Sequence, residues 1–345
     1  MDMIDLRSDT VTRPTPAMRK AMAKAEVGDD VFGEDPTINR LQEMSAERMG
    51  KQAGLFVPSG TMGNLAAVLT HCQRGDEAIM GDRGHTFLFE GGGVSALGGV
   101  MVHTLPNLPD GNLDLSQIEA AIRPDDIHHS ITRLVILENT HNRCGGVILS
   151  PTYTEKVGKL LEKRKILLHL DGARIFNAAV ALGVPARTLA EPADSVTFCL
   201  SKALCAPVGS VLCGALEFIQ KARRIRKMLG GGMRQAGVLA AAGIVALEQM
   251  VDRLSEDHLR AKKLADGLAQ ISGLRLSFGI PQTNMVFAEL AQEVKKTGIE
   301  IVEELKRDNI RIGNVGPRMF RMVTHYWVGD LGIEKTLLAM KKAVR

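Results

Sequence analysis

Short apolar runs alternate with helical patterns along most of this chain, and this alternation limits the folds open to it. Six runs have the length and the continuous apolar character of buried parallel strands: 54–59, 77–82, 132–139, 165–171, 194–201 and 209–215. Helical patterns separate several of them, at residues 61–72, 115–122 and 154–164. Strands interleaved with helices predict an α/β fold with a mainly parallel sheet.

The order of the elements changes near residue 250. An alanine-rich helical pattern at 234–254 closes the first part of the chain. Helical and strand-like segments in a new order follow it: 255–271, 274–279, 284–290, 299–308, 310–314, 318–325 and 334–343. We therefore predict two domains, an N-terminal segment with a large domain over 1–250 and a smaller α+β domain over 251–345.

Charge and composition argue against a nucleic-acid or membrane protein. Lys and Arg exceed Asp and Glu by only four, and the one dense basic cluster, KARRIRK at 221–227, is more typical of a solvated helix face. No apolar stretch has the length of a signal peptide or a membrane helix. The cysteines form no CxxC pair, so we expect reduced thiols, no metal site and a cytoplasmic location. They are Cys72, Cys144, Cys199, Cys205 and Cys213.

A solitary lysine lies between two of the apolar runs, in SVTFCLSKALCAPVGSVLCG at 195–214. Lys202 could extend its amine to solvent, which is the commoner case for a lysine. Its apolar flanks favour burial instead, and desolvation lowers the pKa of a lysine and makes it a better nucleophile. Such a lysine is suited to a Schiff base with an aldehyde.

An acid stands at the end of another run, where Asp171 follows KILLHL. It could cap the helix that begins after Gly172. It could equally face the ring nitrogen of pyridoxal phosphate and keep that nitrogen protonated. Because Lys202 also follows a strand, the cofactor reading gains support.

Two further stretches carry chemistry at strand ends. PSGTMGN at 58–64 places Gly60 and Thr61 at the start of a helix, where backbone N–H groups bind phosphate. His85 follows the run at 77–82 and could stack on a flat ring or cap a loop. GGGVSA at 91–96 matches a dinucleotide fingerprint, but its context is poor, and helix packing explains it more simply.

With these residues in view, the chain resembles the L-threonine aldolases, pyridoxal-phosphate enzymes with the type I fold of aspartate aminotransferase. The resemblance extends from end to end. It is carried by IDLRSDTVTRP, VGDDVFGEDPT, FVPSGTMGN, LENTHNR, HLDGARIFNA, FCLSK, APVGS, RKMLGGGMRQAGVLAAAGI, TNM and RMVTH.

The resemblance implies roles for individual residues. Lys202 would bind the cofactor covalently, Asp171 would face its nitrogen, His85 would stack over its ring, and Gly60 and Thr61 would hold its phosphate. The other implied residues act on the substrate or across an interface. Ser8, Arg174 and Arg321 would bind the substrate carboxylate, His128 would lie near its hydroxyl, and Lys227 and Arg234 would reach the phosphate in a neighbouring subunit.

Two positions depart from the family pattern. Ala203 follows the lysine where glycine is common, so we expect its methyl group to crowd the cofactor without removing a catalytic group. His129 follows His128 where an aromatic residue is common, which makes His128 a less secure choice than His85.

The implied activity is cleavage of L-threonine, and of L-allo-threonine, to glycine and acetaldehyde, with His85 or His128 as the base. The implied assembly is a homo-oligomer, a dimer of dimers with shared active sites. Two alternatives to this activity stay open. A β-eliminating lyase or a racemase would use the same lysine and aspartate. A non-catalytic ligand-binding protein with the same fold would not require the lysine.

Overall fold

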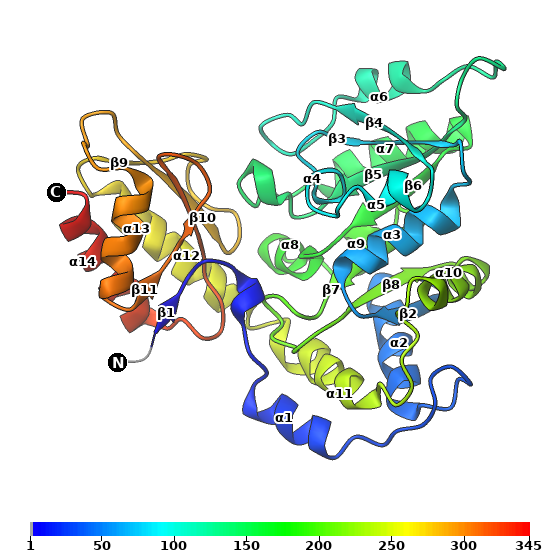
Figure 1. The fold of residues 1–345 in the computed structure, drawn as a ribbon, viewed down its shortest axis with the longest axis horizontal. Helices are drawn as coiled ribbons and strands as arrows, with labels where there is room; N and C mark the ends of the chain where they lie inside the picture. The colour runs from blue at the N-terminus through cyan, green and yellow to red at the C-terminus, as the bar shows by residue number, and fades with distance from the viewer. Residues whose placement is uncertain (1–2) are drawn as a thin grey trace.

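Seven strands form the largest sheet in the computed structural model, which describes residues 3–345 (Figure 1). Across the sheet they are β2 (Ala53–Val57), β8 (Ser210–Gly214), β7 (Ser195–Cys199), β6 (Leu167–Asp171), β5 (Thr132–Glu138), β3 (Glu77–Gly81) and β4 (Met101–Leu105). Only β8 runs antiparallel to its neighbours, β2 and β7. The predicted mainly parallel α/β sheet is therefore confirmed, and the other six strands, β2 included, point the same way.

Helices of the first 250 residues surround this sheet. They are η1 (Asp9–Val11), α1 (Pro16–Ala23), α2 (Pro36–Met49), α3 (Gly60–His71), α4 (His85–Leu88), α5 (Gly93–Ala96), α6 (Leu115–Ala121), η2 (Asn142–Cys144), α7 (Pro151–Arg164), α8 (Ile175–Leu182), α9 (Ala186–Ala190), α10 (Leu216–Met228), α11 (Gly237–Val245) and the π-helical turn η3 (Ala246–Met250). Local signals set many of their ends. In α2, for example, the Asp35 side chain accepts a hydrogen bond from the Ile38 amide at the start, and Gly50 adopts a left-handed φ of 64° at the end.

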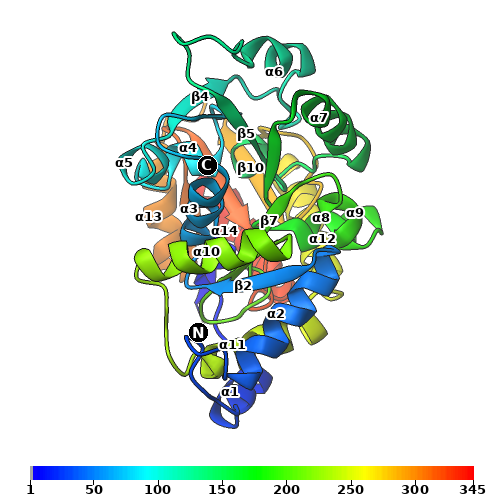
Figure 2. The same cartoon turned by 90° about the vertical axis from the view of Figure 1, so that its right-hand side faces the viewer.

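Side chains that alternate along the strands separate the two faces of the sheet. Leu55 and Val57 of β2 pack in a cluster with α3 and α10, whereas Phe56 between them joins the largest core, which also holds Leu41 of α2. Figure 2 shows α10 and α3 on one side of β2 and α2 on the other. Central strands such as β3, β7 and β8 therefore bury both faces, which explains their continuous apolar sequences.

The C-terminal residues form a second sheet with its own apolar core. Its antiparallel strands, in order, are β12 (Gly313–Asn314), β13 (Met319–Val323), β10 (Met285–Leu290) and β9 (Leu274–Leu276). Its helices are α12 (Leu254–Ala269), α13 (Gly298–Arg307) and α14 (Asp330–Ala343). The N-terminal strand β1 (Ile4–Asp5) pairs with β11 (Ile310–Arg311) of this part, and Leu6 enters its core. The division at residue 250 stays a prediction. Residues 4–6 belong to the predicted N-terminal segment, yet they pack with the C-terminal part.

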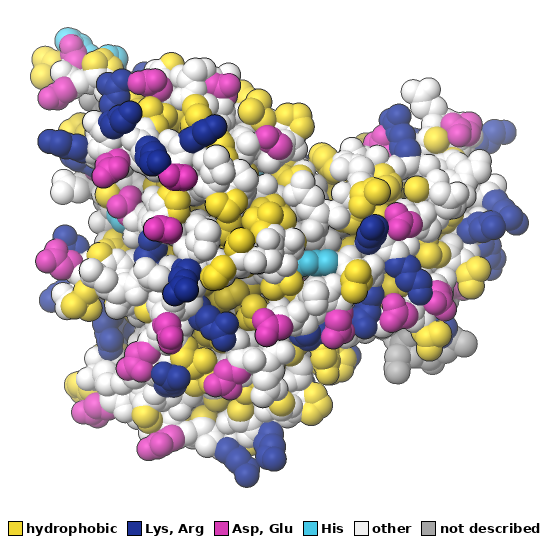
Figure 3. Space-filling view, turned by 180° about the vertical axis from the view of Figure 1, so that it is seen from behind, with side chains coloured by type: hydrophobic (Ala, Val, Ile, Leu, Met, Phe, Trp, Pro, Cys, Tyr) yellow, Lys and Arg dark blue, Asp and Glu magenta, His cyan; other side chains and the backbone are white. Residues whose placement is uncertain are grey.

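Charges of both signs are intermingled on the surface that Figure 3 shows, and a wide notch separates the two parts at the top of that view. The KARRIRK segment lies in α10, where Lys221, Arg224 and Lys227 are exposed as expected. The expectation of a solvated face is wrong for Arg226, which is buried. Among residues 3–345, none of the helices combines the length and apolar character that a membrane crossing requires.

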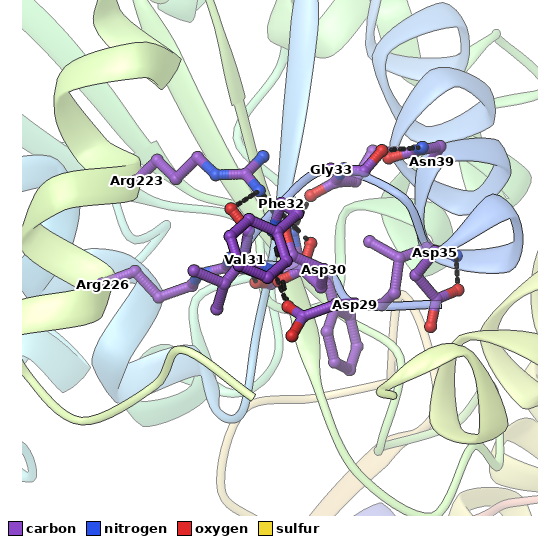
Figure 4. Close-up of polar contacts among 12 residues, drawn as sticks. Asp29, Asp30, Val31, Phe32, Gly33, Asp35, Asn39, Arg223 and Arg226 are labelled. Carbon is purple, nitrogen blue, oxygen red and sulfur yellow. Dashed lines mark hydrogen bonds and ion pairs between the residues drawn. The ribbon is translucent and has the colours of Figure 1, made fainter. Parts of the chain in front are cut away.

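Arg226 is buried because it holds the loop that precedes α2 (Figure 4). Its Nη2 donates to Asp30 Oδ2 at 2.6 Å, and its Nη1 donates to the Phe56 carbonyl at 2.7 Å. Arg223 donates to the Asp30 carbonyl, and Arg234 pairs with Asp29 at 2.9 Å. These contacts thus bind the loop between α1 and α2 to α10 and to Arg234, which follows α10 in the sequence.

We expect Asp30→Ala to lower the free energy of unfolding by about 3 kcal/mol, because the Arg226 guanidinium would stay buried without its anion. Urea denaturation followed by circular dichroism measures the change. The exposed pair of Lys263 and Glu334 is the control, and Glu334→Gln should leave the transition unchanged. Equal stability of the two variants would contradict the importance of the buried pair.

Candidate active site

Four of the predicted site residues follow strands that end at the same edge of the large sheet. Gly60 comes after β2, His85 after β3, Asp171 ends β6, and Lys202 comes after β7. Because β2, β3, β6 and β7 all point the same way, their carboxyl ends lie together, where open α/β sheets bind ligands.

Lys202 is half-buried in the turn that joins β7 to β8. Its carbonyl accepts a hydrogen bond from Thr12 Oγ1 at 2.8 Å, which ties this turn to the N-terminal segment. Among the described residues, no hydrogen-bond acceptor or carboxylate pairs with its Nζ atom. The buried Ala203 beside it adds a methyl group to the same turn. The backbone of the turn is thus tied down, whereas the lysine amine has no partner among the described residues.

Asp171 is 3% exposed, and both of its carboxylate oxygens accept hydrogen bonds. The Ala173 amide donates to Oδ1 at 3.1 Å, and Asn64 Nδ2 donates to Oδ2 at 2.9 Å. The first bond shapes the turn before α8, but Asp171 does not cap this helix, whose N-cap residue is Arg174 and which has no side-chain cap. The second comes from α3 and anchors the carboxylate within the site.

Asn64 Nδ2 also donates to a second buried carboxylate, Glu90 Oε1, at 2.9 Å. The same Glu90 oxygen lies 2.8 Å from His85 Nδ1. This hydrogen bond raises the pKa of His85 above its usual range, although partial burial opposes the effect. Burial raises the pKa of Glu90, although the hydrogen bond with His85 works against it. Glu90 therefore holds the ring of His85 and leaves Nε2 as its available nitrogen.

His85, Glu90 and Asp171 offer ligand atoms within 4.8 Å of one another, a grouping that by type could bind a metal ion. The amide hydrogens of Asn64 point at both carboxylates, however, and would oppose a cation between them. We therefore interpret the cluster as a hydrogen-bonded network.

The predicted phosphate residues stand at the N-terminus of α3. Ser59 caps this helix by accepting from the Met62 amide at 3.2 Å, and Gly60 and Thr61 form its first turn. A side chain at position 60 would come 3.0 Å from Cys199 Sγ, so glycine permits the start of α3 to lie close to the end of β7. In the 91–96 stretch, Gly91 and Gly92 precede the four-residue helix α5, and Gly93 begins it and packs near Leu65.

The two predicted carboxylate-binding arginines differ in their partners. Arg174 donates to both oxygens of Asp9, at 2.7 and 2.5 Å, and both side chains are buried. Burial alone would raise the pKa of Asp9, but the charge and hydrogen bonds of Arg174 prevail and lower it to about 2. This pair also fixes Ser8, which caps η1.

Arg321 binds neutral oxygens instead. It donates to Asn142 Oδ1 at 3.0 Å and to the Arg7 carbonyl at 3.1 Å, while its buried Nε atom has no partner among the described residues. Burial, reinforced by the charge of Arg174, lowers the pKa of Arg321. An incoming carboxylate would accept a hydrogen bond from the unpartnered Nε atom, and its negative charge would favour the charged form of Arg321.

Three predicted residues are not brought to this group within one chain. His128 lies on the loop between α6 and β5 with its side chain 80% exposed, and its Nδ1 is 2.7 Å from Asp126. Lys227 is exposed near the end of α10, and Arg234 is exposed beside Asp29. Their predicted roles stay predictions.

Sequence reasoning did not predict the roles of Asn64, Glu90 and Asp9. Asn64 lies one helical turn after Gly60, so its position on the same face of α3 was a usable signal. Glu90 follows His85 by five residues across a helix end, and Asp9 meets Arg174 from a distant part of the sequence, so only the fold reveals these partners.

The described residues fit pyridoxal phosphate. An unpaired amine suits its aldehyde, the buried carboxylate of Asp171 suits a protonated ring nitrogen, and the start of α3 suits its phosphate. The free carboxylate site at Arg321 suits an amino acid.

Comparison with known proteins agrees with this site. The family model described as beta-eliminating lyase matches residues 5–293. Low-specificity L-threonine aldolase 1 of Arabidopsis thaliana is 49% identical over 347 residues, which cover 100% of this chain and 97% of that protein. The low specificity L-threonine aldolase of Escherichia coli strain K12 is 47% identical over 323 residues, 94% of each chain.

A solved threonine aldolase from Leishmania major has the same fold, with a TM-score of 0.85 over 99% of this chain and 100% of that one, at 22% sequence identity. The predicted pyridoxal-phosphate type I fold is therefore confirmed. The chain belongs to the beta-eliminating lyase family and, within it, to the low-specificity L-threonine aldolases.

Proposed function

We propose that this chain cleaves L-threonine, and L-allo-threonine, to glycine and acetaldehyde with pyridoxal phosphate bound through Lys202. The observation that carries the proposal is the position of Lys202 and Asp171 at the ends of the adjacent parallel strands β7 and β6. An amine for the aldehyde and an acid for the ring nitrogen thus occupy neighbouring strands. The buried and unpaired cysteines support a reducing, cytoplasmic location.

Residues at the start of α3 and at the end of β6 would bind opposite parts of the cofactor. The start of α3, with Gly60 and Thr61, would bind the phosphate, and Asp171 would bind the ring nitrogen. When bound, pyridoxal phosphate supplies an electron sink for the pair released as the bond between Cα and Cβ breaks.

Arg321 would bind the substrate carboxylate, because its positive charge lacks an anionic partner among the described residues. Arg174 would support this site indirectly, since Asp9 already occupies its Nε and Nη2 donors. Ser8, next to Asp9, would contribute its hydroxyl. The carboxylate would then be fixed, and the β-hydroxyl group would have a defined direction.

His85 would accept the proton of the β-hydroxyl group. Its Nδ1 faces Glu90, so its Nε2 atom is free to act as the base. His128 does not reach this group from the same chain, which makes His85 the stronger candidate.

Replacement of Lys202 tests the proposal most directly. We expect Lys202→Ala to abolish threonine cleavage and the visible absorbance of bound cofactor, while circular dichroism stays unchanged. Borohydride treatment followed by mass spectrometry should find a pyridoxyl adduct on Lys202 in the parent chain. The exposed Lys263, changed to Ala, is the control. Full activity in Lys202→Ala, or ammonia and a keto acid in place of glycine and acetaldehyde, would refute the proposal.

The pH profile tests the role of His85. As a base, His85 works when neutral, so kcat/KM should rise as the pH passes its pKa. Glu90 raises that pKa, so Glu90→Gln should move the rising limb to lower pH, by about one unit. Asp171 and Lys202, which also act on His85 with opposite signs, stay unchanged in this variant. An unmoved limb would exclude His85 as the titrating group.

A homo-oligomer, a dimer of dimers, would complete the site through Lys227 and Arg234. Both side chains are exposed, and on the same surface Phe32 of the loop before α2 is 74% exposed and Met228 is 68% exposed. Exposed apolar side chains beside two exposed cations support an interface there.

Mixing two inactive variants tests the shared site. Lys202→Ala and Arg234→Ala should each be inactive alone. After subunits are exchanged, a mixed dimer would contain one site with both groups intact. We expect about a quarter of the parent activity, since half of the dimers are mixed and each has one complete site. Activity that stays absent would contradict shared sites, provided that native mass spectrometry shows mixed species.

A further inference from the structure

A chain of buried polar side chains leads away from Asp171 on the side of the sheet that α3 covers. Asn64 Oδ1 lies 3.1 Å from His169 Nε2, and His169 Nδ1 lies 2.8 Å from Ser195 Oγ. Ser195 Oγ in turn lies 2.7 Å from His71 Nε2. Asn64, His169 and Ser195 are at most 2% exposed, so water cannot replace these contacts.

The available donors and acceptors allow only one direction for each hydrogen bond in this series of side chains. Asn64 Nδ2 uses its two hydrogens for Asp171 and Glu90, so Oδ1 must accept, and His169 Nε2 must carry a hydrogen. His169 Nδ1 then accepts from the Ser195 hydroxyl. Ser195 Oγ accepts in its turn from His71 Nε2. Each assignment determines the next, and no donor faces another donor.

The outer end of the chain is also fixed. His71 is the last residue of α3, and its ring stacks on Phe218 of α10, with 4.3 Å between the ring centroids. Burial lowers the pKa of His71 to about 3 and that of His169 to about 4, so both rings are neutral at neutral pH. A neutral His169 has a single ring hydrogen, which the directional chain requires.

The orientation of the Asn64 amide decides the charge environment of the site. In the observed orientation, N–H groups face the two carboxylates. A flipped amide would place its oxygen against both of them and its nitrogen against the His169 N–H. His169 therefore prevents the flip.

We propose that His169 is a positioning residue for Asp171, on which it acts through the Asn64 amide. This inference rests on the proposed function, because Asp171 matters there as the partner of the cofactor nitrogen. His169 does not touch the cofactor or the substrate. It keeps the Asp171 carboxylate in the position and hydrogen-bonded state that a protonated ring nitrogen needs.

The ring hydrogen of His169 can be located without any cofactor. Nitrogen-15 NMR of histidine-labelled, cofactor-free protein should show His169 neutral at neutral pH, with its hydrogen on Nε2. A hydrogen on Nδ1, or a charged ring, would overturn the inference. This measurement is independent of the proposed function, which would fail separately if the parent chain bound no pyridoxal phosphate.

Cofactor affinity then tests the action on Asp171. We expect His169→Leu to weaken pyridoxal phosphate binding about tenfold in equilibrium dialysis, because a hydrogen bond that orients two charged groups is lost. His169→Gln keeps an N–H donor and should recover most of the affinity.

His258 provides the matched control, since burial also lowers its pKa to about 4 and it contacts Asn177 outside the chain of bonds. His258→Leu should bind the cofactor as the parent does. Parent-like affinity in His169→Leu, or no recovery in a folded His169→Gln, would reduce His169 to a structural residue. Thermal unfolding of each variant separates loss of affinity from loss of fold.

Discussion

A carboxylate buried at the end of a parallel strand must be compensated, and the site is built around this requirement at Asp171. One oxygen is satisfied by the turn that follows the strand, and the other by Asn64 from a helix far away in the sequence. A second buried carboxylate, Glu90, shares the same amide and holds His85. The acid that would face the cofactor and the histidine that would act as base are therefore parts of one network.

Two other carboxylates are also buried, and in each case an arginine compensates the negative charge. Asp9 is buried against Arg174, and Asp30 is buried against Arg226. The first pair fixes the N-terminal segment over the sheet edge, and the second fixes the loop before α2 to α10. Because a buried charge without its partner is very costly, such pairs specify where distant segments meet. Arg321 is the contrasting case, a half-buried cation that binds only neutral oxygens and is therefore suited to an anionic substrate.

Most of the fold could be predicted from the sequence, because buried parallel strands are apolar throughout and several helices begin at a side-chain cap. The exceptions are short or exposed elements. Strand β4 lies at the sheet edge with a largely accessible surface, and β1 and β12 have two residues each, so none has the apolar run that identifies a strand. The basic cluster in α10 was misjudged at Arg226 for a related reason. Composition cannot show that one of its arginines faces an aspartate on another segment.

The sequence by itself determined which chemistry is possible: a lysine and an aspartate after apolar strands, a glycine and a threonine at a helix start, and a family pattern around them. Strand ends and helix starts are local features, so their residues can be recognised before the fold is known. Only the tertiary structure decided which groups act together. It joined Asn64 to Asp171 and Glu90, gave Arg174 to Asp9, left Arg321 without an anion, and placed His128 away from the site of its own chain. These outcomes depend on distances between segments far apart in the chain, which residue types and local spacing do not encode.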